Sequence, residues 1–249
     1  MPVNLHWPPT AQPPELTTHA AHVWAVPLDV SQRTYDGLLA TLAPDEQTRA
    51  NEFRFDEPRR RYVVARGALR RLLGQYLDVA PPDIALTADE HRKPHVAEKH
   101  AASTVQFNVS HSGELAVIGF ATGCKVGVDV EQLRDVHQLE QIARRFFHPS
   151  ETNAVLAAPE PSRNLNFLRC WTGKEAVLKA VGTGILANLA GFQVPVEECR
   201  QGWIECATSE TAEKNNRCWL EQLNPCNGYV AAIACVEANR SVNTYAFTM

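Results

Sequence analysis

The chain has 249 residues, of which 45% are hydrophobic and 21% charged, so it has an ordinary globular composition and enough length for one large core or two small ones. Its formal net charge of −4 excludes nucleic-acid binding driven by bulk charge. Seven cysteines without a C-x-x-C pair, an N-terminus unlike a secretory signal and only short apolar runs lead us to expect a soluble, cytoplasmic protein without nucleic-acid or membrane partners.

The first half of the chain is predicted to combine strands with two helices. Pro44 marks the first turn of the earlier helix, and apolar residues at three- and four-residue steps predict the longer one. In chain order we expect an irregular arm (1–20), a strand (22–30), a helix (41–55), a long helix (58–77), a strand with a turn (80–96) and two strands around Ser112-Gly113 (105–121).

The second half is predicted to begin with a strand, continue with helices and end in short strands. Pro149 separates two helices, and Gly182 closes the third in the usual place for a left-handed cap. The expected elements are a strand (125–133), helices at 139–148, 149–157 and 164–181, and strands at 192–199, 202–208, 217–223 and 228–237. The stretches "SGELAVIGFA" and "NGYVAAIACV" are a weak internal repeat, which suggests two similar lobes.

Two acids on one predicted strand are the first candidates for chemistry. Asp129 and Glu131 are two residues apart and point to the same face of the strand, whereas Val126, Val128 and Val130 point to the other. Adjacent carboxylates repel each other unless a cation lies between them, and Mg²⁺ prefers oxygen ligands. A strand with a solvated polar face is the plainer alternative.

A third acid lies on the helix predicted at residues 164–181. Lys174, Glu175 and Lys179 share one helix face with apolar residues. An i,i+4 pair of Glu175 and Lys179 is the plain interpretation and stabilises a helix by only about 0.3–0.5 kcal/mol. Gly173 argues against it, because a glycine inside a helix costs about 1 kcal/mol relative to alanine and therefore suggests the close approach of another group.

Candidate phosphate-binding residues come from the first half. Ser110 and His111 end a predicted strand, where backbone N–H groups and a histidine could meet a phosphate. The long helix is strongly basic, which suits either phosphate binding or a solvated basic face. Its arginines are Arg59, Arg60, Arg61, Arg66, Arg70 and Arg71.

Four stretches, taken in order and spacing, resemble the 4′-phosphopantetheinyl transferases. They are "RKPHV", "FNVSHSGELAVIGF", "GVDVE" and "FLRCWTGKEAVLKAVGTGI". The similarity extends over residues 45–195 and fits the two-lobed, surfactin-synthetase-activating branch of the family better than its small trimeric members. The resemblance implies Mg²⁺-dependent transfer of the phosphopantetheine arm of coenzyme A to a serine of an apo acyl or peptidyl carrier protein, by a monomer, with Mn²⁺ as another possible metal.

The resemblance also assigns roles to individual residues. Asp129, Glu131 and Glu175 match the metal-binding acids, and with Lys179 the acids Asp129 and Glu175 would be catalytic. Coenzyme A would be bound by Arg61 at its 3′-phosphate and by Lys93, Ser110, His111, Lys174 and Lys179. Arg54 and Glu151 are possible auxiliary residues. Two departures from the family pattern are Gly173, where a bulkier residue is common, and the run of arginines at 59–61, which leaves open which one binds the 3′-phosphate.

The resemblance implies an α+β fold with two pseudo-symmetric lobes. Each lobe would be a mainly antiparallel sheet packed by a long helix, with the ligand in a cleft between the lobes. We expect the N-terminal lobe to span residues 1–125 and the C-terminal lobe residues 126–249. Two other functions use the same residues: a Mg²⁺-dependent phosphohydrolase that acts on a nucleotide diphosphate, and a non-catalytic module that binds carrier proteins.

Overall fold

A computed structural model of the chain describes residues 3–88, 94–97, 104–182, 189–197, 201–206 and 216–249. Its helices are α1 (Gln32–Leu39), α2 (Pro44–Glu52), α3 (Asp56–Leu77), α4 (Leu139–Phe146), α5 (Pro149–Ala157) and α6 (Ser162–Val181), with short 3₁₀ helices at Pro81–Asp83 and Leu189–Gly191. Its strands are β1 (Pro9–Thr10), β2 (Ala20–Pro27), β3 (Leu86–Ala88), β4 (Pro94–Val96), β5 (Val105–Ser112), β6 (Leu115–Thr122), β7 (Val126–Gln132), β8 (Gln201–Cys206), β9 (Asn216–Leu223), β10 (Tyr229–Val236) and β11 (Ser241–Phe247).

The described strands form two principal sheets. One has the order β1-β11-β2-β6-β5, and the other has the order β7-β10-β9-β8. Pairing is antiparallel throughout the second sheet, whereas β11 runs parallel to both β1 and β2 in the first. The two segments of the internal repeat become β6 and β10, which are both inner strands. β11 comes from the end of the chain, so the first sheet draws on both ends.

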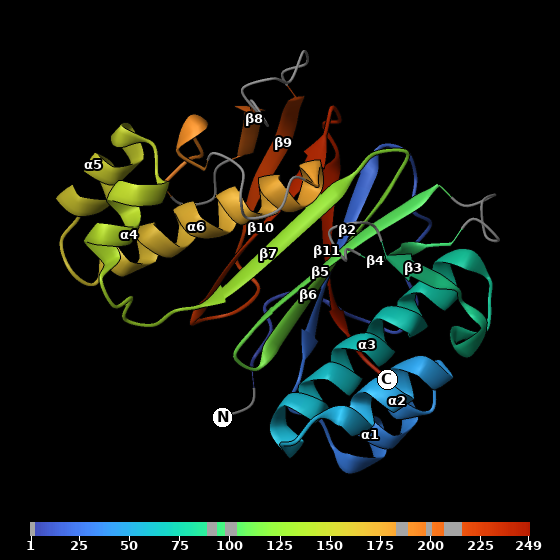
Figure 1. Ribbon diagram of the computed structural model, residues 1–249. Coiled ribbons are helices and arrows are strands. Elements are labelled where there is room, and N and C mark those ends of the chain that lie inside the picture. The colour runs from blue at the N-terminus through green and yellow to red at the C-terminus, as the bar shows by residue number, and fades with distance from the viewer. Residues whose placement is uncertain (1–2, 89–93, 98–103, 183–188, 198–200, 207–215) are drawn as a thin grey trace.

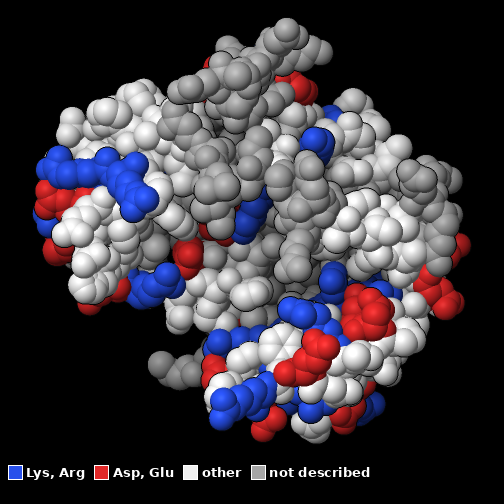
Figure 2. All heavy atoms as spheres, in the orientation of Figure 1, with Lys and Arg blue, Asp and Glu red and all other residues white. Residues whose placement is uncertain are grey.

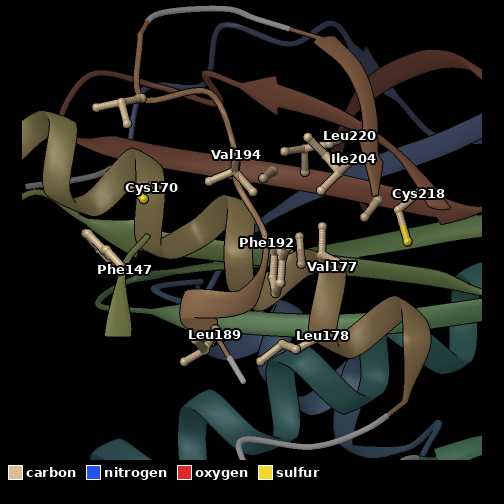
Figure 3. Packing of buried hydrophobic residues seen from close by; sticks show 14 of the residues in the cluster. Phe147, Cys170, Val177, Leu178, Leu189, Phe192, Val194, Ile204, Cys218 and Leu220 are labelled. Carbon is tan, nitrogen blue, oxygen red and sulfur yellow. The ribbon is translucent and has the colours of Figure 1, made fainter. Parts of the chain in front are cut away.

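The two sheets pack against each other and are covered on their outer faces by helices (Figure 1). Between the sheets lies an apolar layer to which β2, β6, β7 and β10 all contribute, including Val23, Val117, Val128 and Ile233. Helix α3 packs on the first sheet. Helix α6 packs on the second sheet, where Phe147, Phe192 and Val194 join its apolar face (Figure 3). The α+β fold with two similar lobes is therefore confirmed.

Most of the predicted elements are present, and α6 ends as expected at Gly182, whose φ of 87° is left-handed. The strand predicted at 192–199 is wrong for its described part, residues 192–197, which are irregular. The reason is that the Phe192 carbonyl accepts from Lys174 Nζ and the Val194 N–H donates to Glu151, so neither group pairs with a neighbouring strand. Helix α1 and strand β11 were not predicted.

Candidate active site

The site lies where the edge strand of one sheet meets the edge strand of the other. Three polar residues of β5 that are two positions apart, Asn108, Ser110 and Ser112, face β7, because successive side chains of a strand alternate between its faces. Asn108 Oδ1 accepts the Val128 N–H at 2.9 Å. Ser110 Oγ donates to Asp129 Oδ1 at 2.7 Å, and Ser112 Oγ donates to Glu131 Oε2 at 2.8 Å. These three contacts join the two lobes and orient both predicted acids.

Helix α6 brings a lysine to the same point. Lys179 Nζ lies 2.7 Å from Asp129 Oδ1 and donates to Ser110 Oγ at 3.0 Å. The helix can approach this closely because β7 has a glycine at position 127. A Cβ there would lie 2.9 Å from the carbonyl carbon of Lys179 and closer still to Ala176 O and Ala180 N. The glycine of "GVDVE" is therefore part of the site.

Burial and neighbouring carboxylates raise the pKa of Glu175 and of Asp129. Burial raises the pKa of Glu175, and the negative charges of Asp129 and Glu131 raise it further, whereas Lys179 acts in the opposite direction. Burial also raises the pKa of Asp129, which is 5% exposed, although Lys179 and Ser110 partly offset this effect. The predicted acids from β7 and α6 thus do form one electrostatic group.

The three carboxylates are ligands of the kind that a divalent cation binds, although their oxygens are not gathered around one point. Within the described ranges, no group of three or more His, Cys, Asp or Glu residues is arranged to hold a metal ion. Asp129 Oδ2, however, is buried and has no hydrogen-bond partner among the described residues. An orphaned carboxylate oxygen beside two further carboxylates is the kind of hard oxygen donor set that Mg²⁺ takes.

On the other face of β5 lies a cavity of about 450 Å³. Its lining includes His111, Arg61, Arg66, Pro94 and Tyr62. Ser110 and His111 are adjacent in sequence but point to opposite faces of the strand, so they reach different parts of the site. The described residues that line this cavity form a pocket at the N-terminal half of α3.

The three consecutive arginines of α3 point in different directions. Arg61 is the one that lines the cavity, where it pairs with Glu57 at 2.6 Å and with Glu114. Arg59 donates to Asn51 at 2.9 Å, and Arg60 lies over the Tyr35 ring. The structure thus distinguishes Arg61 as the arginine of the three that lines the cavity, a question that the sequence left open.

The rest of the basic segment is largely neutralised. Glu46 is buried and pairs with Arg66, at 3.0 Å, and with Arg70, which is itself 2% exposed. Figure 2 shows Asp and Glu side chains interspersed with Lys and Arg over the surface formed by helices α1 to α3. Helix α3 therefore does not present a continuous basic face.

Lys174 is placed differently from its predicted contact with coenzyme A. It is fully buried, and Nζ lies 2.8 Å from Glu151 Oε2, 2.8 Å from Leu189 O and 2.7 Å from Phe192 O. An ammonium group has three donors, so all of them are used inside the lobe. The geometry favours a structural role for Lys174, in which it and the auxiliary Glu151 hold the segment after α6.

The other predicted residues are Lys93 and Arg54. Lys93 lies outside the described residues. Arg54 follows α2 on the surface, with its guanidinium 5.5 Å from the centroid of the Phe55 ring. Sequence reasoning missed Asn108, Ser112 and Gly127. The alternation of polar residues in "FNVSHS" was the signal that could have revealed the first two.

Three carboxylates and a lysine, next to a cavity lined by two arginines, define a site of the class that handles phosphate esters. The comparisons with known proteins identify the family within that class. A model described as the 4′-phosphopantetheinyl transferase superfamily matches residues 125–234, and one described as the N-terminal part of a 4′-phosphopantetheinyl transferase matches residues 29–122. The chain belongs to the 4′-phosphopantetheinyl transferase superfamily.

Similar proteins carry the same description. The 4′-phosphopantetheinyl transferase HetI of Nostoc sp. is 36% identical over 90% of this chain and 91% of its own length. The 4′-phosphopantetheinyl transferase Sfp of Bacillus subtilis is 24% identical over 82% of this chain and 86% of its own length. A solved holo-[acyl-carrier-protein] synthase of Thermotoga maritima shares 19% identity over 46% of this chain and 63% of its own, with a TM-score of 0.31, a likeness too weak to support an inference.

The family membership confirms that the chain is a transferase of this type. Enzymes of this family transfer the phosphopantetheine group of coenzyme A to a serine of a carrier protein, and the hydrolase and the non-catalytic module lose their support. No helix in the described parts of the chain is both long and apolar enough to cross a membrane.

Proposed function

We propose that Asp129, Glu131 and Glu175 bind the divalent cation of the transfer reaction, and that coenzyme A binds with its 3′-phosphate at Arg61 and its diphosphate beside Lys179. The buried, unpartnered Oδ2 of Asp129 is the observation that carries this proposal. Mg²⁺, or Mn²⁺, would neutralise charge that develops on the diphosphate oxygens.

Glu175 is the proposed proton acceptor for the attacking serine of the carrier protein. A general base works best when its pKa lies near the working pH. Burial and the two neighbouring acids raise the pKa of Glu175 toward that range. Lys179, from the next turn of α6, supplies positive charge where the phosphate oxygens gain negative charge.

The ligand must reach both faces of β5. Arg61 and His111 line the cavity on one face, and Ser110 contacts Asp129 and Lys179 on the other. Coenzyme A meets this requirement because it carries a phosphate on its ribose and a separate diphosphate. Arginine suits the 3′-phosphate because its guanidinium forms two parallel hydrogen bonds with phosphate oxygens.

Incubation with coenzyme A, Mg²⁺ and a panel of apo acyl and peptidyl carrier proteins tests the proposal, with the mass of each intact carrier as the readout. We expect one phosphopantetheine group to be added to a carrier, and we expect the reaction to stop with EDTA and resume with excess Mg²⁺ or Mn²⁺. Transfer that continues in the presence of EDTA would remove the metal role. Consumption of coenzyme A without any carrier would indicate hydrolysis instead.

A further inference from the structure

Arg61, at the edge of the cavity beside β5, is held by two acids from different elements. Glu57 lies one turn earlier on α3, and its carboxylate is 2.6 Å from Arg61 Nη2. Glu114 lies in the turn between β5 and β6, and its carboxylate accepts a hydrogen bond from the same nitrogen. Arg61 Nε, in contrast, is buried and has no hydrogen-bond partner among the described residues. Both carboxylates are therefore gathered at Nη2.

The shape of a guanidinium group makes Nη2 the critical nitrogen. A phosphate that binds through two parallel hydrogen bonds uses one edge of the planar group. One such edge presents Nε with Nη2, and the other presents Nη1 with Nη2. Since Nη2 belongs to both edges, a phosphate that binds Arg61 in this way has to replace a carboxylate there.

The backbone of Glu114 is fixed by both lobes. Its N–H donates to the hydroxyl of Tyr229, on β10, at 3.0 Å, and its carbonyl accepts the Leu28 N–H at 2.9 Å. The preceding Gly113 has a φ of 54°, and a Cβ there would lie 2.7 Å from the Tyr229 hydroxyl. The turn is therefore held against the second lobe. Only rotation of the Glu114 side chain, which is 39% exposed, can remove its carboxylate from Arg61.

The two acids differ in how firmly they hold Arg61. The Glu57 side chain is 70% exposed and forms an i,i+4 pair on the surface of a helix, an arrangement that is weak because water screens it. The Glu114 carboxylate comes from another element, with a fixed backbone and a hydrogen bond to Nη2. Glu114 is thus the acid that competes more strongly with an incoming phosphate.

We propose that Glu114 is a specificity-determining residue, whose carboxylate occupies Arg61 until the 3′-phosphate of the nucleotide displaces it. This inference rests on the proposed binding of that phosphate by Arg61. Binding then exchanges one anion for another, so Arg61 favours 3′-phosphorylated nucleotides less than an unpaired arginine would. The nucleotide that remains after phosphopantetheine transfer, adenosine 3′,5′-bisphosphate, keeps the 3′-phosphate. The competing carboxylate therefore promotes release of this product.

Equilibrium binding of adenosine 3′,5′-bisphosphate and of adenosine 5′-monophosphate, measured by calorimetry, tests the proposal. We expect Glu114→Gln to lower the Kd of the bisphosphate by about tenfold, because a negative charge a few ångströms from the phosphate is removed at a partly solvated site. The Kd of the monophosphate, which lacks the 3′-phosphate, should hardly change. Unchanged or weaker binding of the bisphosphate to Glu114→Gln would overturn the proposal.

Two further variants separate charge from shape and position. Glu114→Asp keeps the carboxylate and should bind the bisphosphate as the wild type does, so a gain like that of Glu114→Gln would contradict competition by charge. Glu57→Gln removes the exposed acid and should change the Kd by less than about twofold. An equal gain in Glu57→Gln would mean that Glu114 has no special part. The thermal unfolding midpoint of each variant, expected to stay close to that of the wild type, verifies the fold.

Arg61→Ala distinguishes a failure of this inference from a failure of the proposed function. If Arg61 binds the 3′-phosphate, Arg61→Ala should lose most of the preference for the bisphosphate over the monophosphate. A preference that persists in Arg61→Ala would remove the assignment of Arg61 and, with it, the role of Glu114. A preference that is lost in Arg61→Ala and unchanged in Glu114→Gln would overturn the role of Glu114 alone.

Discussion

Asp129 differs from Glu131 and Glu175 because three elements meet at its side chain. β7 carries it, β5 contacts it through Ser110, and α6 contacts it through Lys179. One of its oxygens receives both contacts, and the other has no partner within the described structure. A buried carboxylate with one satisfied oxygen and one orphaned oxygen is costly, and a bound cation would remove that cost.

Asp129→Asn tests this residue with little change in shape. We expect phosphopantetheine transfer to fall by about 10²–10³-fold, the usual loss when a group that stabilises developing charge is removed, while the thermal unfolding midpoint changes little. Glu140→Gln is the control, since that side chain is 61% exposed on α4 and should leave the rate unchanged. Turnover like that of the wild type in Asp129→Asn would remove Asp129 from the reaction.

Arg61 is predicted to bind the 3′-phosphate of coenzyme A. We expect Arg61→Ala to raise the KM for coenzyme A by about 10–100-fold, which corresponds to the loss of a charge-assisted hydrogen bond, and to raise the KM for 3′-dephospho-coenzyme A much less. Arg59→Ala is the matched control, because Arg59 contacts Asn51 and does not line the cavity. Equal weakening for both substrates would assign Arg61 to another part of the ligand.

His22 should make the stability of the fold depend on pH. It is 1% exposed, and its Nδ1 lies 2.8 Å from the Tyr76 hydroxyl, which also accepts the Trp24 Nε1–H. Burial lowers the pKa of His22 to about 4, so between pH 6.5 and pH 4 the unfolded chain binds a proton that the folded chain does not.

The free energy of unfolding should therefore decrease as the pH falls below 6.5, by at most about 1.4 kcal/mol per pH unit from His22. Above pH 6.5 the residue is neutral in both states and contributes no pH dependence. Urea unfolding between pH 4.5 and 7 would measure this, with His22→Gln for comparison. The variant should show a smaller loss than the wild type, and parallel curves would disprove the role of His22.

At the scale of elements, the contact between α6 and β7 decides the geometry of the site. Gly127 has no side chain, so the helix backbone at Ala176 and Ala180 packs directly on the strand. Gly173, on the helix itself, is different: a Cβ there would be 3.4 Å from Val194 and 3.5 Å from Leu220, which is ordinary packing distance. The expectation that Gly173 marks a close approach is therefore wrong, and the close approach is at Gly127.

Two alanine substitutions should have opposite effects. Gly127→Ala should destabilise the protein by about 1–3 kcal/mol, because a Cβ would overpack this contact, and should also lower the rate of transfer as Lys179 moves. Gly173→Ala should be neutral or stabilising by up to about 1 kcal/mol through its higher helix propensity. Chemical denaturation of both variants measures the difference. Equal effects would mean that α6 does not depend on Gly127 for its position.

On the scale of the whole molecule, the N-terminal arm contacts both sheets. Leu5 forms a bridge with Cys226, and the His6 N–H donates to Pro225 O at 2.9 Å, next to β10. Pro9 and Thr10 pair with β11 of the other sheet. Trp7 lies between these contacts and is 8% exposed, within the apolar layer that joins the sheets. The arm predicted to be irregular therefore fastens the two lobes together.

Trp7→Ala should destabilise the fold by about 3 kcal/mol, the lower end of the usual cost of truncating a buried aromatic side chain. Because the arm contacts both lobes, we expect a single cooperative unfolding transition at a lower urea concentration. Phe55→Ala is the control, since Phe55 is 65% exposed, and it should change stability by less than about 0.5 kcal/mol. A similar effect of both variants would show that Trp7 does not join the lobes.

The sequence by itself determined the local chemistry and most of the elements. Alternation along a strand and three- to four-residue steps along a helix are local properties, so the pairing of Asp129 with Glu131 on one face, and the helix that carries Glu175 and Lys179, were readable from spacing. The order of the four motifs was sufficient to indicate the family.

Only the tertiary structure decided which groups meet. Lys174 and Lys179 are five residues apart on one helix, yet the first is enclosed with Glu151 in the lobe and the second reaches Asp129. Ser110 and His111 are neighbours on opposite faces of β5. The pairing of β11 with β2 joins residues more than two hundred positions apart. Such contacts depend on how the two sheets pack, and no periodicity within a single segment carries that information.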